Sequence, residues 1–208
     1  VRNETRDTIA VTFDVPPELA DSFKYQQGQH LTLRAMIDGE DVRRSYSICS
    51  AVQDNVLRVA IKRTPGGLFS TWANENLKPG DTLEVMPPMG HFNVPLVPET
   101  KRHYAAFAAG SGITPILSIM KTVLGREPLS RFTLIYANRA AKSTMFKEEL
   151  EDLKNRYMAR LSLHHVFSGE DTELPLNSGV MNRDKLGEFL AKLVDAPRID
   201  HVFALCGA

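Results

Sequence analysis

Hydrophobic and polar residues alternate in short runs along the first hundred residues, as they do in β-strands. From Thr8 to Val15 the large apolar residues fall on every second position, which predicts a strand buried on one face. A second alternating run, His30–Arg34, is followed by Asp38-Gly39, a strong signal for a hairpin turn. Further strands are predicted at Val42–Ser50, Val56–Lys62 and Thr82–Met86. Strands at this spacing predict an antiparallel β-barrel or sandwich, which a proline-rich stretch ends near residue 98.

After residue 98 the pattern changes to apolar runs that alternate with helical periodicity. Strands are predicted at His103–Ala109, Arg131–Tyr136, Leu161–Phe167 and His201–Leu205. Helices are predicted between them, at Pro115–Leu124, Thr144–Tyr157 and Asp184–Val194. Such alternation predicts a parallel sheet with helices on both faces, which binds ligands at the carboxyl ends of its strands. We therefore expect an antiparallel β-barrel domain over residues 1–98 and an α/β domain over residues 99–208.

The first strand of the α/β half leads into its helix through the turn Gly110-Ser111-Gly112-Ile113-Thr114-Pro115. The glycines permit a tight turn and a close approach of the backbone to a ligand, and Pro115 suits the first turn of a helix. The N–H groups and the positive dipole end of that helix favour a phosphate. The third glycine of the usual dinucleotide motif is a proline here, so a turn that serves packing alone stays an alternative.

Charge and cysteine content exclude several classes of function. The 25 basic and 25 acidic residues balance, and no basic tract occurs, so binding to nucleic acid or to an anionic membrane is not expected. No apolar run approaches the ~20 residues that a membrane span needs. Two distant cysteines, Cys49 and Cys206, indicate neither a disulfide framework nor a metal site, so we expect a cytoplasmic protein without a bound metal. The chain begins at Val1 and ends directly after an apolar strand, so we expect a fragment of a longer protein.

The barrel half carries a candidate flavin site in Arg44-Ser45-Tyr46-Ser47. Two residues apart on a strand, Arg44 and Tyr46 project from one face, whereas Ser47 faces the other way. A guanidinium suits the flavin pyrophosphate, an aromatic ring suits the isoalloxazine, and the Ser47 hydroxyl and backbone offer a donor near N5. An exposed arginine and a half-buried tyrosine on an ordinary edge strand are the alternative.

A second anion cradle follows at Gly66-Gly67, which precede a short predicted helix. The free N–H groups of Leu68, Phe69 and Ser70 at the start of that helix offer a place for the pyrophosphate, whose charge Arg44 would neutralise. A tight turn before a packing helix explains the same residues locally. Two anion cradles and the Arg-x-Tyr-Ser strand in one chain favour the cofactor interpretation.

Five motifs in order resemble the ferredoxin–NADP reductase superfamily. They are Arg44-Ser45-Tyr46-Ser47, Gly66-Gly67-x-x-Ser70, Pro88-Met89-Gly90-His91-Phe92, the turn Gly110–Pro115, and Cys206-Gly207. Within that superfamily, residues 28–33, 44–49 and 132–139 are similar to the subfamily of phenylacetyl-CoA epoxidase reductases. The resemblance covers nearly the whole chain.

The resemblance implies a site for FAD and a site for NAD(P)H. The residues expected to bind FAD are Arg44, Tyr46, Ser47, Ile48, Lys62, Gly67, Leu68, Phe69 and Ser70. Those expected to bind the nicotinamide nucleotide are Gly110, Gly112, Ile113, Thr114, Cys206 and Gly207. Tyr46, Ser47 and Cys206 are expected beside the reacting atoms, where Cys206 helps to place the nicotinamide C4 against flavin N5. The flavin carries the chemistry, and the fold supplies the approach of the reactants.

The choice between NADPH and NADH depends on the end of the strand that contains Tyr136. An acidic residue there suits the ribose 2′-hydroxyl of NADH, whereas a cation suits the 2′-phosphate of NADPH. The stretch offers Arg139, Lys142 and Ser143 at the expected start of a helix, with no carboxylate before Glu148. We therefore expect NADPH to be preferred; solvent-exposed cations that tolerate either nucleotide are the alternative.

The implied function is an FAD-dependent NAD(P)H oxidoreductase whose electrons pass to a [2Fe–2S] ferredoxin-type domain and on to an oxygenase component. The epoxidase reductases carry that domain with plant-type cysteine spacing, and this chain lacks those cysteines. The cluster is therefore expected in a missing C-terminal domain. A flavin-holding but catalytically idle electron-transfer or regulatory subunit is the alternative.

Overall fold

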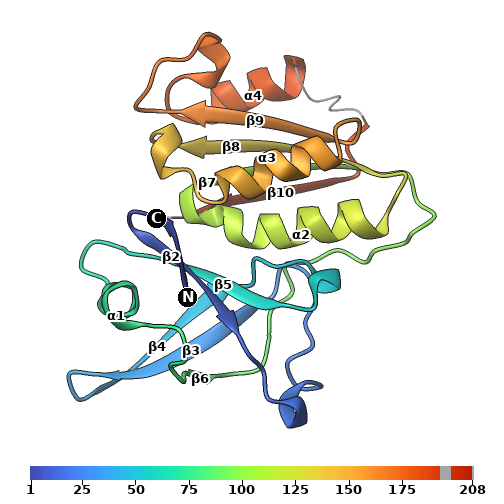
Figure 1. The fold of residues 1–208 in the computed structure, drawn as a ribbon. Coiled ribbons are helices and arrows are strands. Elements are labelled where there is room, and N and C mark those ends of the chain that lie inside the picture. The colour runs from blue at the N-terminus through green and yellow to red at the C-terminus, as the bar shows by residue number, and fades with distance from the viewer. Residues whose placement is uncertain (193–197, 208) are drawn as a thin grey trace. The chain divides into compact units, whose positions relative to one another are not determined.

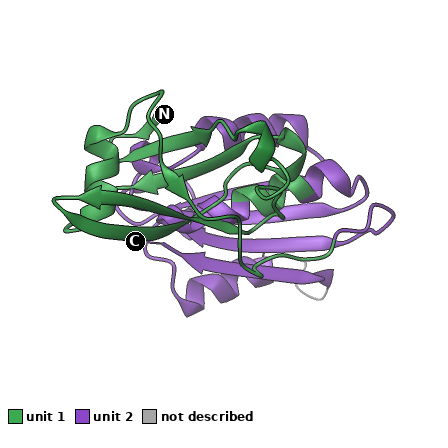
Figure 2. Cartoon of the chain, turned by 90° about the horizontal axis from the view of Figure 1, so that it is seen from below, with its two compact units in different colours: residues 1–95, 117–122 green, residues 96–116, 123–208 purple. Residues whose placement is uncertain are grey.

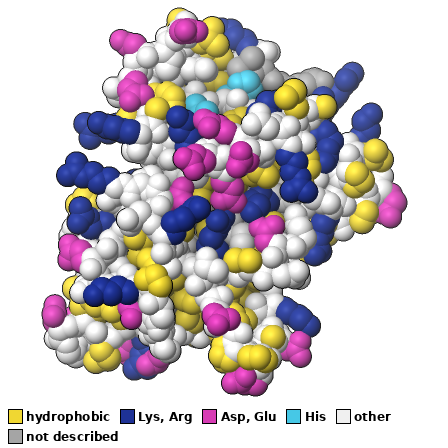
Figure 3. All heavy atoms as spheres, viewed as in Figure 1, with side chains coloured by type: hydrophobic (Ala, Val, Ile, Leu, Met, Phe, Trp, Pro, Cys, Tyr) yellow, Lys and Arg dark blue, Asp and Glu magenta, His cyan; other side chains and the backbone are white. Residues whose placement is uncertain are grey.

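The computed structural model describes residues 1–192 and 198–207 (Figure 1). By their internal contacts the residues fall into two compact units, coloured separately in Figure 2. Unit 1 comprises residues 1–95 and 117–122, and unit 2 comprises residues 96–116 and 123–208. Figure 3 shows basic and acidic side chains interspersed over the face in view, in keeping with the balanced charge of the sequence. Among the described residues no helix has both the length and the apolar character needed to cross a bilayer.

Unit 1 is built from two antiparallel sheets of three strands each. The first sheet has the order β1 (Arg2–Thr5), β2 (Thr8–Phe13), β5 (Leu57–Lys62). The second has the order β4 (Glu40–Ser47), β3 (His30–Ile37), β6 (Glu84–Val85). The predicted strands are confirmed with small shifts of their ends, whereas β1 has no apolar alternation and was not predicted. The hairpin at Asp38-Gly39 is also confirmed, because both residues have positive φ, 52° and 84°.

The alternation of β2 and β5 places their large apolar residues in one core. Ile9 and Val11 lie in register with Ile61 and Val59, and all four side chains are buried. Leu31 and Leu33 of β3 enter the same core from the other sheet. An isolated bridge between Ile48 and Val59 links the two sheets. The antiparallel barrel predicted from the sequence is confirmed.

The helix α1 (Leu68–Asn76) follows the glycine pair at residues 66–67 and packs on the barrel core. It buries Phe69 and Ala73, whose spacing of four residues brings them to one face of the helix. Short 3₁₀ helices lie at Pro17–Leu19 and Val52–Asp54.

Unit 2 holds a four-stranded parallel sheet with the order β10-β7-β8-β9. The strands are β7 (His103–Ala109), β8 (Arg131–Asn138), β9 (Leu161–Phe167) and β10 (His201–Cys206). The helices are α2 (Ile113–Arg126), α3 (Lys147–Arg156) and α4 (Arg183–Lys192). Figure 1 shows α4 on one side of the sheet and α3 on the other. Phe189 of α4 packs with Ala105, Ile135 and Val166 from three neighbouring strands. The α/β half of the prediction is confirmed.

Two helices start more than one residue away from their predicted starts. A 3₁₀ turn, Gly110–Gly112, precedes α2, so helical structure starts earlier than Pro115. The prediction that a helix begins at Thr144 is wrong, because a 3₁₀ turn at Ala141–Ser143 ends there and α3 starts only at Lys147. Phe146 adopts the left-handed conformation with φ of 57°, which a continuous α-helix cannot contain. The last two residues of the predicted helix Asp184–Val194 lie outside the described residues. A further 3₁₀ turn lies at Pro175–Asn177.

Candidate functional site

The predicted flavin residues of β4 lie on the strand that pairs with the core strand β3. Register places Arg44 opposite Leu33 and Tyr46 opposite Leu31, so Arg44 and Tyr46 share the face of the strand that borders the core. Tyr46 is half-buried, and burial raises the pKa of its hydroxyl to about 12 despite the nearby Arg44. Arg44 is exposed, and its Nη1 donates to the carbonyl oxygen of Arg43 at 2.7 Å. A guanidinium and a neutral phenol thus project from one stretch of strand.

The neighbouring predicted residues differ in their exposure. Ser47 is partly buried at the end of β4 and pairs with His30 of β3. Ile48 is fully buried, and its backbone N–H donates to the carbonyl oxygen of Gln29 at 2.9 Å. Lys62 is partly buried at the end of β5. Ile48 therefore exposes no surface to a ligand in this structure, whereas Ser47 and Lys62 are partly exposed.

The start of α1 forms a compact turn that leaves no room for a side chain at Gly67. A Cβ atom there would lie 2.5 Å from Ser70 Oγ and 3.0 Å from the carbonyl oxygen of Thr64. Ser70 Oγ accepts a hydrogen bond from the Thr64 N–H at 3.1 Å and donates to the carbonyl oxygen of Gly67 at 3.3 Å. Within the described part of the chain, no side chain caps this helix start. The first-turn N–H groups therefore remain suited to an anion.

Packing of Phe69 brings the two flavin motifs of unit 1 together. The rings of Tyr46 and Phe69 lie 5.7 Å apart between centroids, and Phe69 also contacts Trp72 at 5.6 Å. Phe69 is buried with 1% of its surface exposed, so its side chain belongs to the core and only its backbone can serve a ligand. Tyr46 and the start of α1 thus lie next to each other.

In unit 2 the glycine turn and the Cys206-Gly207 motif contact each other at the carboxyl ends of β7 and β10. Cys206 pairs in register with Ala109, and the Gly207 N–H donates to the Ala109 carbonyl oxygen at 2.9 Å. A Cβ atom on Gly112 would lie 2.6 Å from the carbonyl oxygen of Leu205, and one on Gly207 would collide with Ser111 Oγ and the Gly112 N. The two motifs, about a hundred positions apart in sequence, therefore require glycines because their backbones touch.

The donors at the start of α2 are partly used by the turn itself. The Ile113 N–H donates to the carbonyl oxygens of Gly110 and Ser111, and Thr114 Oγ1 donates to the Ser111 carbonyl oxygen at 3.0 Å. Gly110 has a φ of 53°, which favours glycine. Its carbonyl oxygen accepts a hydrogen bond from Tyr136 Oη at 3.0 Å. Sequence reasoning missed Tyr136, because only the pairing of β7 with β8 brings its hydroxyl to the turn.

The three residues expected to select NADPH follow β8, but without the predicted helix start. Arg139 and Lys142 are exposed, and Ser143 Oγ donates to the carbonyl oxygen of Ala140 at 2.9 Å. Because α3 starts only at Lys147, Ser143 does not lie at its N-terminus, and the helix dipole does not favour an anion there. The fold also brings a carboxylate to this segment that the sequence did not predict there. Glu170 Oε2 accepts a hydrogen bond from the Ala141 N–H at 3.0 Å.

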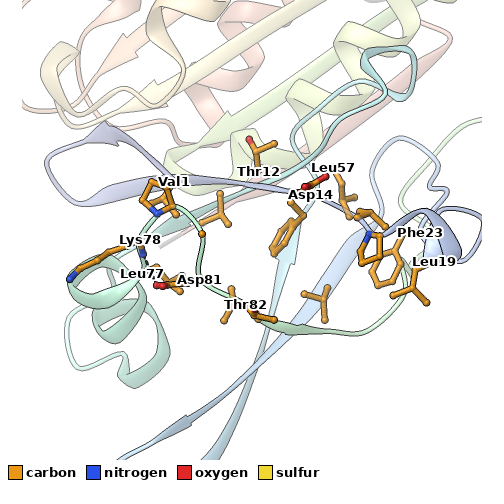
Figure 4. Close-up of a pocket in the computed structure, with 18 residues that line it drawn as sticks. Val1, Thr12, Asp14, Leu19, Phe23, Leu57, Leu77, Lys78, Asp81 and Thr82 are labelled. Atoms are coloured by element: carbon orange, nitrogen blue, oxygen red, sulfur yellow. Dashed lines mark hydrogen bonds between the residues drawn. The ribbon is translucent and has the colours of Figure 1, made fainter.

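A pocket of about 570 Å³ opens elsewhere in unit 1 (Figure 4). Its lining includes Phe13, Leu19, Phe23 and Leu57, and the backbone turn at its rim is closed by a hydrogen bond from the Lys78 N–H to Asp81 Oδ2 at 2.8 Å. No residue of the predicted flavin site belongs to the described lining. The pocket therefore lies apart from the chemistry that the motifs indicate.

Comparison with known families identifies both halves of the chain. Residues 2–94 match the family described as oxidoreductase FAD-binding domain, and residues 107–208 match the family described as oxidoreductase NAD-binding domain. These matches agree with the barrel that carries the Arg44 motif and with the parallel sheet that carries the glycine turn. The chain is thus an oxidoreductase with an FAD-binding and an NAD-binding domain.

Individual relatives narrow the assignment. The chain is 45% identical over 207 residues to one of the subunits of 1,2-phenylacetyl-CoA epoxidase from Escherichia coli, a match covering 100% of this chain and 58% of that protein. It is 44% identical over 168 residues to the ferredoxin reductase component of 3-ketosteroid-9-alpha-monooxygenase from Rhodococcus rhodochrous, covering 79% of this chain and 46% of that protein. The chain thus spans about half the length of these curated relatives.

Solved structures share the fold. The flavohem-like FAD/NAD-binding domain of nitric oxide dioxygenase from Vibrio cholerae matches with a TM-score of 0.74 at 24% identity, covering 98% of this chain and 95% of that chain. A ferredoxin-NADP+ reductase from Plasmodium falciparum matches with a TM-score of 0.78 at 21% identity, covering 98% of this chain and 81% of that chain. The chain thus has the same fold as these two proteins, and its two halves belong to the oxidoreductase FAD-binding and NAD-binding domain families.

Proposed function

We propose that the protein takes hydride from NAD(P)H onto FAD and passes the electrons on toward an oxygenase. One observation carries this proposal: the glycine turn Gly110–Gly112 and the Cys206-Gly207 motif contact each other at the carboxyl edge of the parallel sheet, where such sheets bind nucleotides. The family assignment of both domains supports the same reaction. We also propose that residues 1–98 form the FAD-binding domain and residues 99–208 the NAD(P)-binding domain.

The residues of unit 1 fit FAD in both charge and shape. Exposed Arg44 would neutralise the pyrophosphate, and the uncapped first turn of α1 at Leu68, Phe69 and Ser70 would donate backbone N–H groups to it. Tyr46, a neutral and half-buried phenol, would lie against the isoalloxazine. When bound, FAD would supply the hydride-accepting chemistry. Ser47 and Lys62 complete the proposed flavin site, and buried Ile48 would support it from the core.

The residues of unit 2 would hold the nicotinamide nucleotide. The turn formed by Gly110, Gly112, Ile113 and Thr114 would receive its phosphates. Cys206 and Gly207 end β10 directly beside that turn and would orient the nicotinamide ring. Arg139, Lys142 and Ser143 would favour NADPH over NADH, because two exposed cations attract the 2′-phosphate.

The relatives' names support the proposed electron acceptor. Several are called reductase components or subunits of monooxygenases, the glycine betaine monooxygenase reductase subunit of Pseudomonas aeruginosa among them. We propose that the acceptor of this protein is likewise a [2Fe–2S] ferredoxin-type domain, which then reduces an oxygenase component such as phenylacetyl-CoA epoxidase. We also propose a cytoplasmic location.

Flavin content and turnover test the proposal together. Purified protein, reconstituted with FAD where necessary, should be yellow and should reduce ferricyanide with NAD(P)H. Protein that cannot be loaded with FAD would contradict the proposal. A flavin-holding but idle subunit predicts instead that the yellow protein binds the nucleotide without steady turnover, so the same assay separates the two functions.

A further inference from the structure

We propose that Glu170 is a specificity-determining residue, whose carboxylate disfavours a 2′-phosphate on the adenosine ribose of the nicotinamide nucleotide. The inference rests on the proposed nucleotide site of unit 2 and deepens it. Glu170 would thereby reduce the preference for NADPH that Arg139 and Lys142 would otherwise give.

Hydrogen bonds beyond the ends of β8 and β9 hold the segment that carries Glu170. The Ser168 N–H donates to the Asn138 carbonyl oxygen at 3.0 Å, and the Gly169 N–H donates to the Arg139 carbonyl oxygen at 2.8 Å. These bonds continue the pairing of the two strands past their last residues. The backbone that leads to Glu170 is therefore fixed against the segment with the candidate 2′-phosphate residues.

Close packing at Gly169 fixes this segment further. A Cβ atom on Gly169 would lie 2.8 Å from the Arg139 carbonyl oxygen and 3.2 Å from Arg139 Cγ. Only a glycine fits between the two chains at this point without a shift. Directly after it, Glu170 Oε2 accepts the Ala141 N–H at 3.0 Å. The carboxylate is thus held at Ala141, which lies between Arg139 and Lys142 in the segment that follows β8.

The charge of Glu170 matters at this position because charge decides which ribose group a protein can bind. At the end of the second strand of such a fold, a carboxylate accepts a hydrogen bond from a 2′-hydroxyl, whereas a cation accommodates a 2′-phosphate. This chain brings both kinds of group to the same place. A doubly charged phosphate would be attracted by the exposed Arg139 and Lys142 and repelled by Glu170. The net preference is therefore the difference of two opposing effects.

The hydrogen bond to Ala141 also suggests a competing role, in which Glu170 only holds the loop. The substitution Glu170→Gln separates the two roles, because the amide oxygen still accepts the Ala141 N–H while the negative charge is lost. Asp171→Asn is the matched control, since Asp171 is exposed, adjacent in sequence and loses the same charge. Both variants retain a side chain of the parent's size.

Binding of two fragments provides a readout that does not depend on turnover. Isothermal titration with 2′,5′-ADP and with 5′-AMP compares ligands that differ only in the 2′-phosphate. We expect Glu170→Gln to raise the affinity for 2′,5′-ADP by roughly threefold to tenfold and to leave 5′-AMP nearly unchanged or slightly weaker. The gain should shrink at high salt, because these groups are exposed. Asp171→Asn should change neither affinity by a comparable factor.

Kinetics on the FAD-loaded protein should agree with the titrations. The ratio of kcat/KM for NADPH to that for NADH should rise in Glu170→Gln and stay near the parental value in Asp171→Asn. An unchanged ratio of the two affinities in Glu170→Gln, or an equal change for both ligands, would overturn the inference and leave Glu170 a loop-holding residue. If the parent bound neither fragment, the proposed nucleotide site itself would be wrong. That result differs from one in which both fragments bind and Glu170→Gln does not change their relative affinities.

Discussion

At the scale of single residues, Arg44 is the group whose loss should affect flavin binding most directly. Arg44→Ala removes the cation that we assign to the pyrophosphate, a charge-assisted interaction worth roughly 1.5–3 kcal/mol. FAD content after dialysis should fall accordingly. Arg43→Ala is the control, because Arg43 lies on the other face of β4 and binds Asp41, with Nη2 to Oδ2 at 3.1 Å. If both variants lost flavin equally, or if neither lost it, the assignment of Arg44 to the flavin site would be wrong.

The hydroxyl of Tyr136 is a second residue-scale contribution, which acts through the backbone. It holds the carbonyl oxygen of Gly110 at 3.0 Å, and Gly110 begins the turn that we assign to the nucleotide. Tyr136→Phe should weaken nucleotide binding by about 1 kcal/mol, the usual worth of one neutral hydrogen bond. The measurement is KM for NADPH together with Kd for NADP+, with flavin content as an internal standard.

Tyr157→Phe is the matched control for that substitution. The Tyr157 ring contacts the guanidinium groups of Arg156 and Arg160 at 5.4 and 5.1 Å from its centroid, away from the glycine turn. Removal of its hydroxyl should therefore leave nucleotide affinity unchanged. A parental affinity in Tyr136→Phe would show that the turn keeps its geometry without this bond.

At the scale of elements, the junction of β7, α2 and β10 depends on the absence of a side chain at Gly112. An added methyl group would lie 2.6 Å from the Leu205 carbonyl oxygen, which is backbone and cannot rotate away. Gly112→Ala should lower both stability and nucleotide affinity, because the turn and the end of β10 must separate. Thermal unfolding and titration with NADP+ measure the two effects.

Gly187 in α4 supplies the contrast, because nothing lies within 4 Å of a Cβ atom built there. In an open helical position, alanine is favoured over glycine by roughly 0.5–1 kcal/mol. Gly187→Ala should thus leave nucleotide binding intact and leave stability unchanged or slightly raised. Similar losses in both variants would mean that the tight contact at Gly112 is not the cause.

The strand β9 should make stability depend on pH. Burial lowers the pKa values of His164 and His165 from the ordinary value of 6.5, with Lys154 adding to the effect on His164. Below pH 6.5 these histidines therefore bind more protons in the unfolded chain than in the folded chain. Their contribution to the free energy of unfolding is fully present above that pH and is lost as the pH falls through the folded-state pKa values. Chemical unfolding at about pH 7.5 and about pH 5.5 should show this loss.

His165→Phe tests the cause of that loss. The buried His165 Nδ1 has no hydrogen-bond partner among the described residues, and the ring stacks on Phe167 at 5.9 Å, so a phenyl ring can take its place. The variant should lose part of the pH dependence. His91→Asn, which removes an exposed histidine of unit 1, should keep all of it. Identical pH dependence in parent and His165→Phe would refute the assignment.

At the scale of the whole molecule, FAD should stabilise the fold that binds it. A ligand that binds only the folded state adds RT ln(1 + [L]/Kd), about 2.7 kcal/mol at a hundredfold excess over Kd. Removal of FAD should therefore lower the melting temperature, and added FAD should restore it. In Arg44→Ala, the FAD concentration needed to restore the melting temperature should rise in proportion to the increase in Kd for FAD. A melting temperature that is independent of FAD would contradict the proposed flavin site.

The sequence alone determined the elements of both domains except β1, because their signals are local. Alternation in β2 and β3, the hairpin at Asp38-Gly39 and the continuous apolar run of β7 each follow from residues that are neighbours in the chain. The glycine motifs also marked their turns correctly. The start of α3 could not be predicted this way, because the left-handed Phe146 that delays it is buried by tertiary packing.

Only the tertiary structure decided which distant residues meet. The sheet order β10-β7-β8-β9 places Gly207 against Gly112, brings the Tyr136 hydroxyl to Gly110 and sets Glu170 against Ala141. A sequence pattern encodes the face on which a side chain lies, but not the neighbour that strand order and loop closure give to that face. For this reason the sequence predicted only cations for the ribose 2′ position, whereas the fold brings Glu170 to the same segment, where we propose that it disfavours a 2′-phosphate.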